Sequence, residues 1–253
     1  RELDYDRIKA LHELGQTMAE AAAMMTGTTV TERVLGAAWP PNDSKPLAEL
    51  MHGNILEVGL PEWSEADQTL ARAVQRELGV FGESDFFGQV ADGLPLEILG
   101  DEPIAFEQGM GGGSDDIAEV SWNVPTVRLW YPGNIPGAIA HHWSSSISMA
   151  TPIAHAGANY AARVVAMTAI DLLADPVKVQ EAWTYFREVT TKDYQWRSLI
   201  PEGTPPPIDM NADKMDRYRS QLQALRYDPT RFDTYLEQLG IEYPTVRDPQ
   251  PDH

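Results

Sequence analysis

Apolar residues recur every three or four positions in five long stretches, which is the spacing of an amphipathic helix. These stretches are residues 3–26, 44–58, 64–78, 155–174 and 176–190. Each predicts a helix, and shorter helical patterns follow Asn211 and Asp228.

The ends of these helices carry residues suited to capping. Gly27 follows the first stretch and readily takes the left-handed conformation of a C-cap. Ser44 and Ser64 precede the next two stretches, where a hydroxyl can accept a hydrogen bond from the first turn. Asp175 and Pro176 separate the fourth from the fifth.

Other stretches alternate apolar and polar residues, which predicts strands. They are residues 28–35, 118–122 and 127–131. The helix, strand, helix order of residues 3–58 predicts part of a small α+β layer. The stretch 155–174, apolar nearly all round, is expected to be buried against the sheet. Three short strands are too few to pair all of their own backbone N–H and C=O groups. We therefore expect further strands from sequence outside this chain.

Charge excludes two classes of partner. The 253 residues include 38 acidic and 19 basic side chains, a net charge of -19. Such a chain repels nucleic-acid phosphates and anionic lipids, so neither nucleic acid nor membrane is expected as a partner. No run of about 18 apolar residues is present, and no signal sequence is visible, so a cytoplasmic location is the default expectation.

The absence of cysteine limits the metal chemistry. With no cysteines in the sequence, any transition-metal site must use His, Asp and Glu. An anionic small substrate would need a local positive centre, and a metal ion would supply one.

Potential chemistry is concentrated in residues 109–155. A glycine-rich turn leads to Asp115 and Asp116, and three of the six histidines follow at His141, His142 and His155. The turn lacks the Gly-Lys-Ser/Thr of a phosphate-binding loop, and no Gly-x-Ser-x-Gly marks a nucleophilic serine. A flexible loop is an equally good interpretation of the turn taken alone, adjacent acids are usually solvated, and isolated histidines are more often structural than catalytic.

Three motifs in this chain resemble the dinuclear-metal amidohydrolase and aminoacylase family of metallopeptidases. They are Gly-Ser-Asp-Asp-Ile-Ala-Glu-Val-Ser-Trp at 113–122, His-His-Trp at 141–143, and Ala-His-Ala-Gly at 154–157. The resemblance implies a metallopeptidase-like α/β catalytic domain combined with an α+β lid that dimerises. Residues 1–62 would be the second half of the lid, 63–190 the C-terminal part of the catalytic domain, and 191–253 a helical extension.

The resemblance also implies roles for individual residues. His141 matches a metal ligand through the His-x-Trp pattern. The turn residues Gly113, Ser114 and Asp116 would lie beside the substrate, Asn42 would reach it from a lid loop, and His142 and His155 would position a ligand or assist charge stabilisation.

Several family motifs have no match in this sequence: the early His-x-Asp, the bridging aspartate and the Glu-Glu pair that supplies the general base. We therefore expect the base and most metal ligands on a separate N-terminal chain, an expectation that the start at Arg1 also prompts. The implied activity is hydrolysis of an N-acyl or N-aroyl amino acid with two divalent ions, Zn or Mn, in a homo-oligomer formed through the lid. The alternatives are a non-catalytic, lid-dimerising subunit of the same fold and an acidic binding module that uses the glycine turn.

Overall fold

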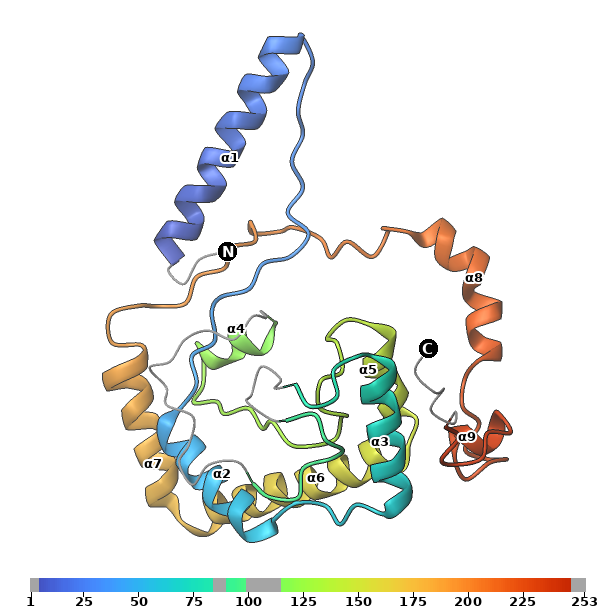
Figure 1. Cartoon of the computed structure of the whole chain (residues 1–253). Coiled ribbons are helices and arrows are strands. Elements are labelled where there is room, and N and C mark those ends of the chain that lie inside the picture. Colours follow the sequence, from blue (N-terminus) through green and yellow to red (C-terminus); the bar gives the residue numbers. More distant parts are fainter. Residues whose placement is uncertain (1–4, 84–89, 99–114, 247–253) are drawn as a thin grey trace. The chain divides into compact units, whose positions relative to one another are not determined.

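The computed structural model describes residues 5–83, 90–98 and 115–246 (Figure 1). The chain divides into two compact units, each assembled from three segments. The first unit comprises Arg1–Glu49, Ile104–Arg128 and Asp175–Asp216, and the second comprises Leu50–Pro103, Leu129–Ala174 and Arg217–His253. The predicted domain limits at residues 62 and 190 stay predictions.

Helices make up the regular structure of the described residues. The first unit holds α1 (Tyr5–Thr26), α4 (Ile117–Ser121), α7 (Pro176–Tyr185) and a π-helical turn, η1 (Phe186–Thr190). The second holds α3 (Glu65–Glu77), α5 (Trp143–Met149), α6 (Pro152–Ala174) and α9 (Tyr235–Gln238). Two helices begin in the first unit and end in the second, α2 (Lys45–Val58) and α8 (Ala212–Ala224).

Several predicted helix ends are confirmed. Gly27 follows α1 with a φ of 64°, and its left-handed backbone ends the helix. Ser64 caps α3 in a reciprocal arrangement, because its side chain accepts from the Asp67 N–H and Asp67 accepts from the Ser64 N–H. Asp175 caps α7 through the Val177 N–H at 3.0 Å.

The predicted strands are wrong within the described residues. Residues 117–121 form α4, and residues 28–35 and 127–131 form neither helix nor strand. Among the described residues, the pairing typical of a β-sheet occurs once, as an isolated parallel β-bridge between Asp43 and Thr126. An α/β fold is therefore not confirmed: alternation alone makes no strand where no neighbouring backbone supplies the hydrogen bonds.

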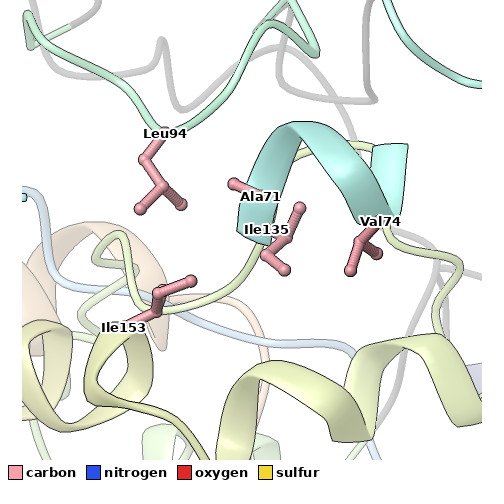
Figure 2. Close-up of a cluster of buried hydrophobic side chains, with 5 residues drawn as sticks. All are labelled: Ala71, Val74, Leu94, Ile135 and Ile153. Carbon is pink, nitrogen blue, oxygen red and sulfur yellow. The ribbon is translucent and has the colours of Figure 1, made fainter. Parts of the chain in front are cut away.

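The core of the second unit surrounds α3. Ala71 and Val74 from this helix pack with Leu94, Ile135 and Ile153, which come from two loops and α6 (Figure 2). Ala71 and Ile153 are wholly buried. Residues far apart in the chain thus share one apolar cluster, which fixes α3 and the start of α6 together.

A buried amide holds the loops of this unit. Gln75 on α3 is 0% exposed, and its side chain donates to the carbonyls of Gly93 (3.0 Å) and Pro136 (3.1 Å). Its Oε1 accepts from the Gly93 N–H at 2.7 Å. Every polar atom of the side chain is satisfied, so this burial is stabilising and specific.

Helix α6 is not buried all round, contrary to prediction. Ile153, Gly157, Val164 and Thr168 are buried, whereas Leu173 on the same helix is 85% exposed. Gly157 lets the loop at Gly133 approach, because a Cβ there would lie 2.3 Å from the Pro132 carbonyl oxygen. The sheet that was expected to cover the rest of α6 is not found among the described residues.

Candidate functional site

The first unit brings the Asn42 loop, residues 39–44, against the segment that follows the glycine-rich turn. Asp115 Oδ1 accepts from the Ala118 N–H at 3.2 Å and so starts α4 immediately after that turn. Ser121 closes the short helix by donating to the Ala118 carbonyl at 2.6 Å. Helix α4 is therefore held at both ends by its own side chains.

Hydrogen bonds from α4 hold Asn42. The Asn42 N–H donates to Ser121 Oγ at 2.9 Å, and the Asn42 side-chain amide donates to the Ser121 carbonyl at 3.3 Å. Ser121 is 1% exposed. Beside them, the Trp122 indole donates to the Pro40 carbonyl at 2.8 Å. The structure thus joins two segments that the resemblance assigned to substrate binding, and it positions them through Ser121.

Arg128 links the same two segments by charge. Its Nη2 lies 3.2 Å from Asp43 Oδ2, and its Nη1 lies 3.5 Å from Asp115 Oδ2. Arg128 Nε and Asp43 Oδ1 are buried without a hydrogen-bond partner, so the Arg128–Asp43 pair uses one bond where a bidentate pair would use two. One guanidinium here offsets two carboxylates of a strongly acidic chain.

Aromatic rings support this cluster. Trp39, 2% exposed, lies between Tyr5 and Trp122, with ring centroids 4.7 and 4.8 Å away. Its N–H donates to Glu119 at 3.1 Å, and the Trp196 indole donates to the same carboxylate. Glu119 thus adds a bond between α4 and the Asn42 loop and also ties α4 to Trp196.

The second unit carries the three predicted histidines. His142 caps α5: its Nδ1 accepts from the Ser144 N–H at 3.4 Å and is 2.9 Å from the buried Ser144 Oγ. With Nδ1 as the acceptor, a neutral ring carries its proton on Nε2. The sequence predicted a substrate contact for His142, and the structure shows a capping role.

His141 and His155 are exposed. His141 has a φ of 58°, a left-handed conformation that a residue other than glycine takes at a cost of order 1–3 kcal/mol and that occurs preferentially at functional sites. His155 lies in the first turn of α6, three residues after the helix begins. The backbone conformations of the two neighbours differ, because His141 is left-handed whereas His142, the N-cap of α5, is extended.

The predicted site residues fall into separate groups. Asn42 and Asp116 belong to the first unit, and the three histidines belong to the second. Gly113 and Ser114 lie outside the described residues. In the described part of the chain, no three His, Asp or Glu side chains are placed to hold a metal ion. These residues by themselves therefore do not fit a metal centre.

Two residues of the cluster were missed from the sequence, Ser121 and Arg128. Arg128 left a signal, because it is a charged residue within the otherwise apolar run 127–131. Ser121 left none, since a serine in an alternating stretch reads as a solvent-facing position. Within the described ranges, no helix combines the length and apolar character that crossing a membrane requires.

Comparison with known proteins finds a relative in Escherichia coli (strain K12), a subunit of p-aminobenzoyl-glutamate hydrolase. The two are 28% identical over 219 residues, 81% of this chain and 44% of that protein. The chain resembles a hydrolase subunit. It spans less than half the length of that relative. No family model matches the chain, and no solved structure matches it.

The resemblance predicted from the motifs at 113–157 is thereby confirmed. Its restriction to part of the relative agrees with the prediction that this chain corresponds to a C-terminal portion.

Proposed function

We propose that this chain is part of an amide hydrolase that cleaves an N-acyl or N-aroyl amino acid. The observation that carries the proposal is the similarity to a p-aminobenzoyl-glutamate hydrolase subunit over 81% of the chain. The Asn42 loop and the segment after the glycine turn support it, because they are joined as a shared substrate-binding surface would require.

The proposed roles follow the resemblance. His141 would supply a metal ligand, and Asn42, Gly113, Ser114 and Asp116 would bind substrate. His142 and His155 would orient bound groups, His142 through its free Nε2 edge while Nδ1 caps α5. Ser121 and Arg128 would act as positioning residues for Asn42 and Asp115.

The resemblance implies two divalent ions, Zn or Mn, which would activate water for attack on the amide. Because the described residues alone do not fit a metal ion, we derive no catalytic step through one from this chain. A partner chain bearing the general base and the remaining ligands completes the proposal, together with a homo-oligomer formed through the residue 1–62 region.

The second candidate is a non-catalytic subunit of the same fold. The lack of a three-residue metal cluster in the described ranges agrees with it, as it agrees with a hydrolase whose remaining ligands lie on a partner chain.

An assay on the native complex distinguishes the two candidate functions. The complex is purified by an affinity tag on this chain, so that its natural partners are retained. The assay is release of p-aminobenzoate from p-aminobenzoyl-glutamate, with metal content measured on the same sample. The hydrolase proposal expects both activity and bound Zn or Mn. His141→Ala should lower activity by roughly 10–100-fold or more, the loss that even an outer-shell partner causes. It should also lower the metal content, by up to the one ion of the two that His141 would hold.

His12→Ala is the matched control, because His12 is an exposed histidine on α1 whose partner is Glu32. It should leave activity and metal content unchanged. If His141→Ala kept its activity and its metal content, the assignment of His141 as a metal ligand would be wrong. If the assembled material had neither activity nor metal, the non-catalytic candidate would stand.

A further inference from the structure

A hollow of about 520 Å³ lies between the end of α8 and α9 in the second unit. Its lining includes Arg226, Tyr227, Asp228, Arg231, Phe232 and Gln238. The volume is within the range of small-molecule sites. None of the residues assigned to amide hydrolysis lines it.

A fixed turn at residues 228–231 presents Arg231, and Arg226 precedes this turn by two residues. Asp228 Oδ1 accepts from the N–H (3.0 Å) and the hydroxyl (2.6 Å) of Thr230, and the Asp228 carbonyl accepts from the Arg231 N–H at 3.2 Å. Pro229 restricts the backbone between them. The turn is therefore ordered before any ligand arrives, which lowers the entropy lost on binding.

The walls of the hollow are also fixed. The Tyr227 hydroxyl donates to the Phe232 carbonyl at 2.7 Å, and the rings of Tyr227 and Tyr235 meet edge to face. Gln238 accepts from the Asp228 N–H at 2.8 Å and donates to the Arg226 carbonyl at 2.9 Å. The hollow is thus lined by two aromatic side chains and two arginines, on a backbone that these hydrogen bonds hold in place.

Charge selects the kind of ligand. The stretch from Lys214 to Arg231 has five basic and two acidic residues in a chain of net charge -19. Neither Arg226 nor Arg231 forms an ion pair within 4.0 Å of a carboxylate in the described part of the chain. The hydrogen bonds from Thr230, and after them the charge of Arg231, lower the pKa of Asp228. The Arg231 guanidinium lies 5.3 Å from the centroid of the Phe232 ring instead. Asp228, the one acid in the lining, already accepts two hydrogen bonds from Thr230.

We propose that this hollow binds a small aromatic carboxylate. Planar guanidinium groups of Arg226 and Arg231 recognise the carboxylate through paired N–H donors, and the rings of Tyr227 and Phe232 contact the aromatic ring. The site is independent of the proposed hydrolase activity.

The test uses the full chain and benzoate as the probe, with binding followed by ligand-observed NMR. The expected dissociation constant is on the order of 1 mM, as the size of the probe allows. Benzamide, the neutral analogue of the same shape, should bind at least about tenfold more weakly, because only the carboxylate forms charge-assisted bonds.

Variants locate the site. Arg226→Ala and Arg231→Ala should each weaken benzoate binding about tenfold, whereas Arg226→Lys should recover part of the loss. Arg217→Ala is the charge-matched control, since Arg217 lies over the Tyr218 ring and does not line the hollow. Circular dichroism checks that each exposed-residue variant is folded.

Three results would overturn the proposal. The first is no benzoate binding at 10 times the expected dissociation constant, that is, about 10 mM. The second is equal binding of benzamide, which would make the hollow merely apolar. The third is an equal loss in Arg217→Ala, which would reduce the effect to general electrostatic attraction.

Discussion

Helices α1 and α3 both carry apolar residues at helical spacing, separated from the polar residues more clearly on α3, but their surroundings differ. α3 buries Asp67, Ala71, Val74 and Gln75, whereas α1, nearly twice as long, has no buried residue. Met25 at the end of α1 is 87% exposed. An apolar stripe predicts that a helix forms, and only the rest of the fold decides whether the stripe is covered.

The largest expected difference between these regions lies in the core around α3. Ile153→Ala removes a wholly buried side chain and should destabilise the second unit by about 2–5 kcal/mol. Met18→Ala on α1, where the side chain is 65% exposed, should change stability by less than about 0.5 kcal/mol. Hydrogen exchange of the α1 and α3 amides as a function of urea measures the two effects, each in its own unit. Comparable losses would mean that the face of α1 is covered in solution.

A smaller effect is expected where the end of the chain contacts α3. The Tyr243 hydroxyl donates to Asp67 Oδ1 at 2.6 Å. A hydrogen bond to a carboxylate contributes about 1.5–3 kcal/mol, so Tyr243→Phe should lower the stability of the second unit by about that amount near pH 7.

The same contact should depend on pH. Burial and the hydrogen bond to Asp67 raise the pKa of Tyr243 above its ordinary value. A raised pKa in the folded state means that the contribution is complete below the unfolded pKa of about 10 and is lost as pH rises toward the folded value. Wild type should therefore lose stability between about pH 9 and pH 11 relative to Tyr243→Phe in unfolding titrations. A constant difference over that interval would show that the hydroxyl does not make this bond in solution.

The smallest expected effect compares two serines that both precede helices. Ser64→Ala removes the cap of α3 and should cost about 1 kcal/mol. Ser44→Ala before α2 should cost less, because Ser44 Oγ is buried without a hydrogen-bond partner. Thermal unfolding of the two variants decides the point, and a larger loss for Ser44→Ala would reveal a partner for its hydroxyl.

These serines show how far sequence reasoning reached. The same pattern predicted a cap at both positions, and the helices do begin at Lys45 and Glu65. Local spacing fixes where a helix begins. Local spacing does not determine whether the serine hydroxyl accepts a hydrogen bond from the first turn. That bond depends on the backbone angles of the serine and on the packing around it.

The strand predictions failed for a related reason. Ala118, Val120 and Trp122 alternate with polar residues, yet Asp115 and Ser121 hold residues 117–121 in a helical turn. Side-chain bonds to the local backbone outweighed a five-residue alternation for which no neighbouring strand was at hand.

The roles of the candidate site residues stay predictions. The resemblance placed Asn42 in a lid and Asp116 in the catalytic domain, whereas both residues belong to the first unit of the structure. The contacts of Ser121 and Arg128 with the Asn42 loop could not be predicted, since they join positions about 80 residues apart. Such contacts follow from tertiary structure and leave no periodic trace.

The interleaved segments of the two units bear on the order of folding during synthesis. The first unit needs residues up to Glu49 and again from Asp175 to Asp216, so it cannot complete its contacts until the ribosome has made the intervening chain. At about 5–20 residues per second, the stretch between residues 49 and 175 takes roughly 6–25 s to emerge. During that interval Trp39 lacks the carbonyl of Arg197 that accepts its indole N–H, so the contact that buries this ring cannot yet form.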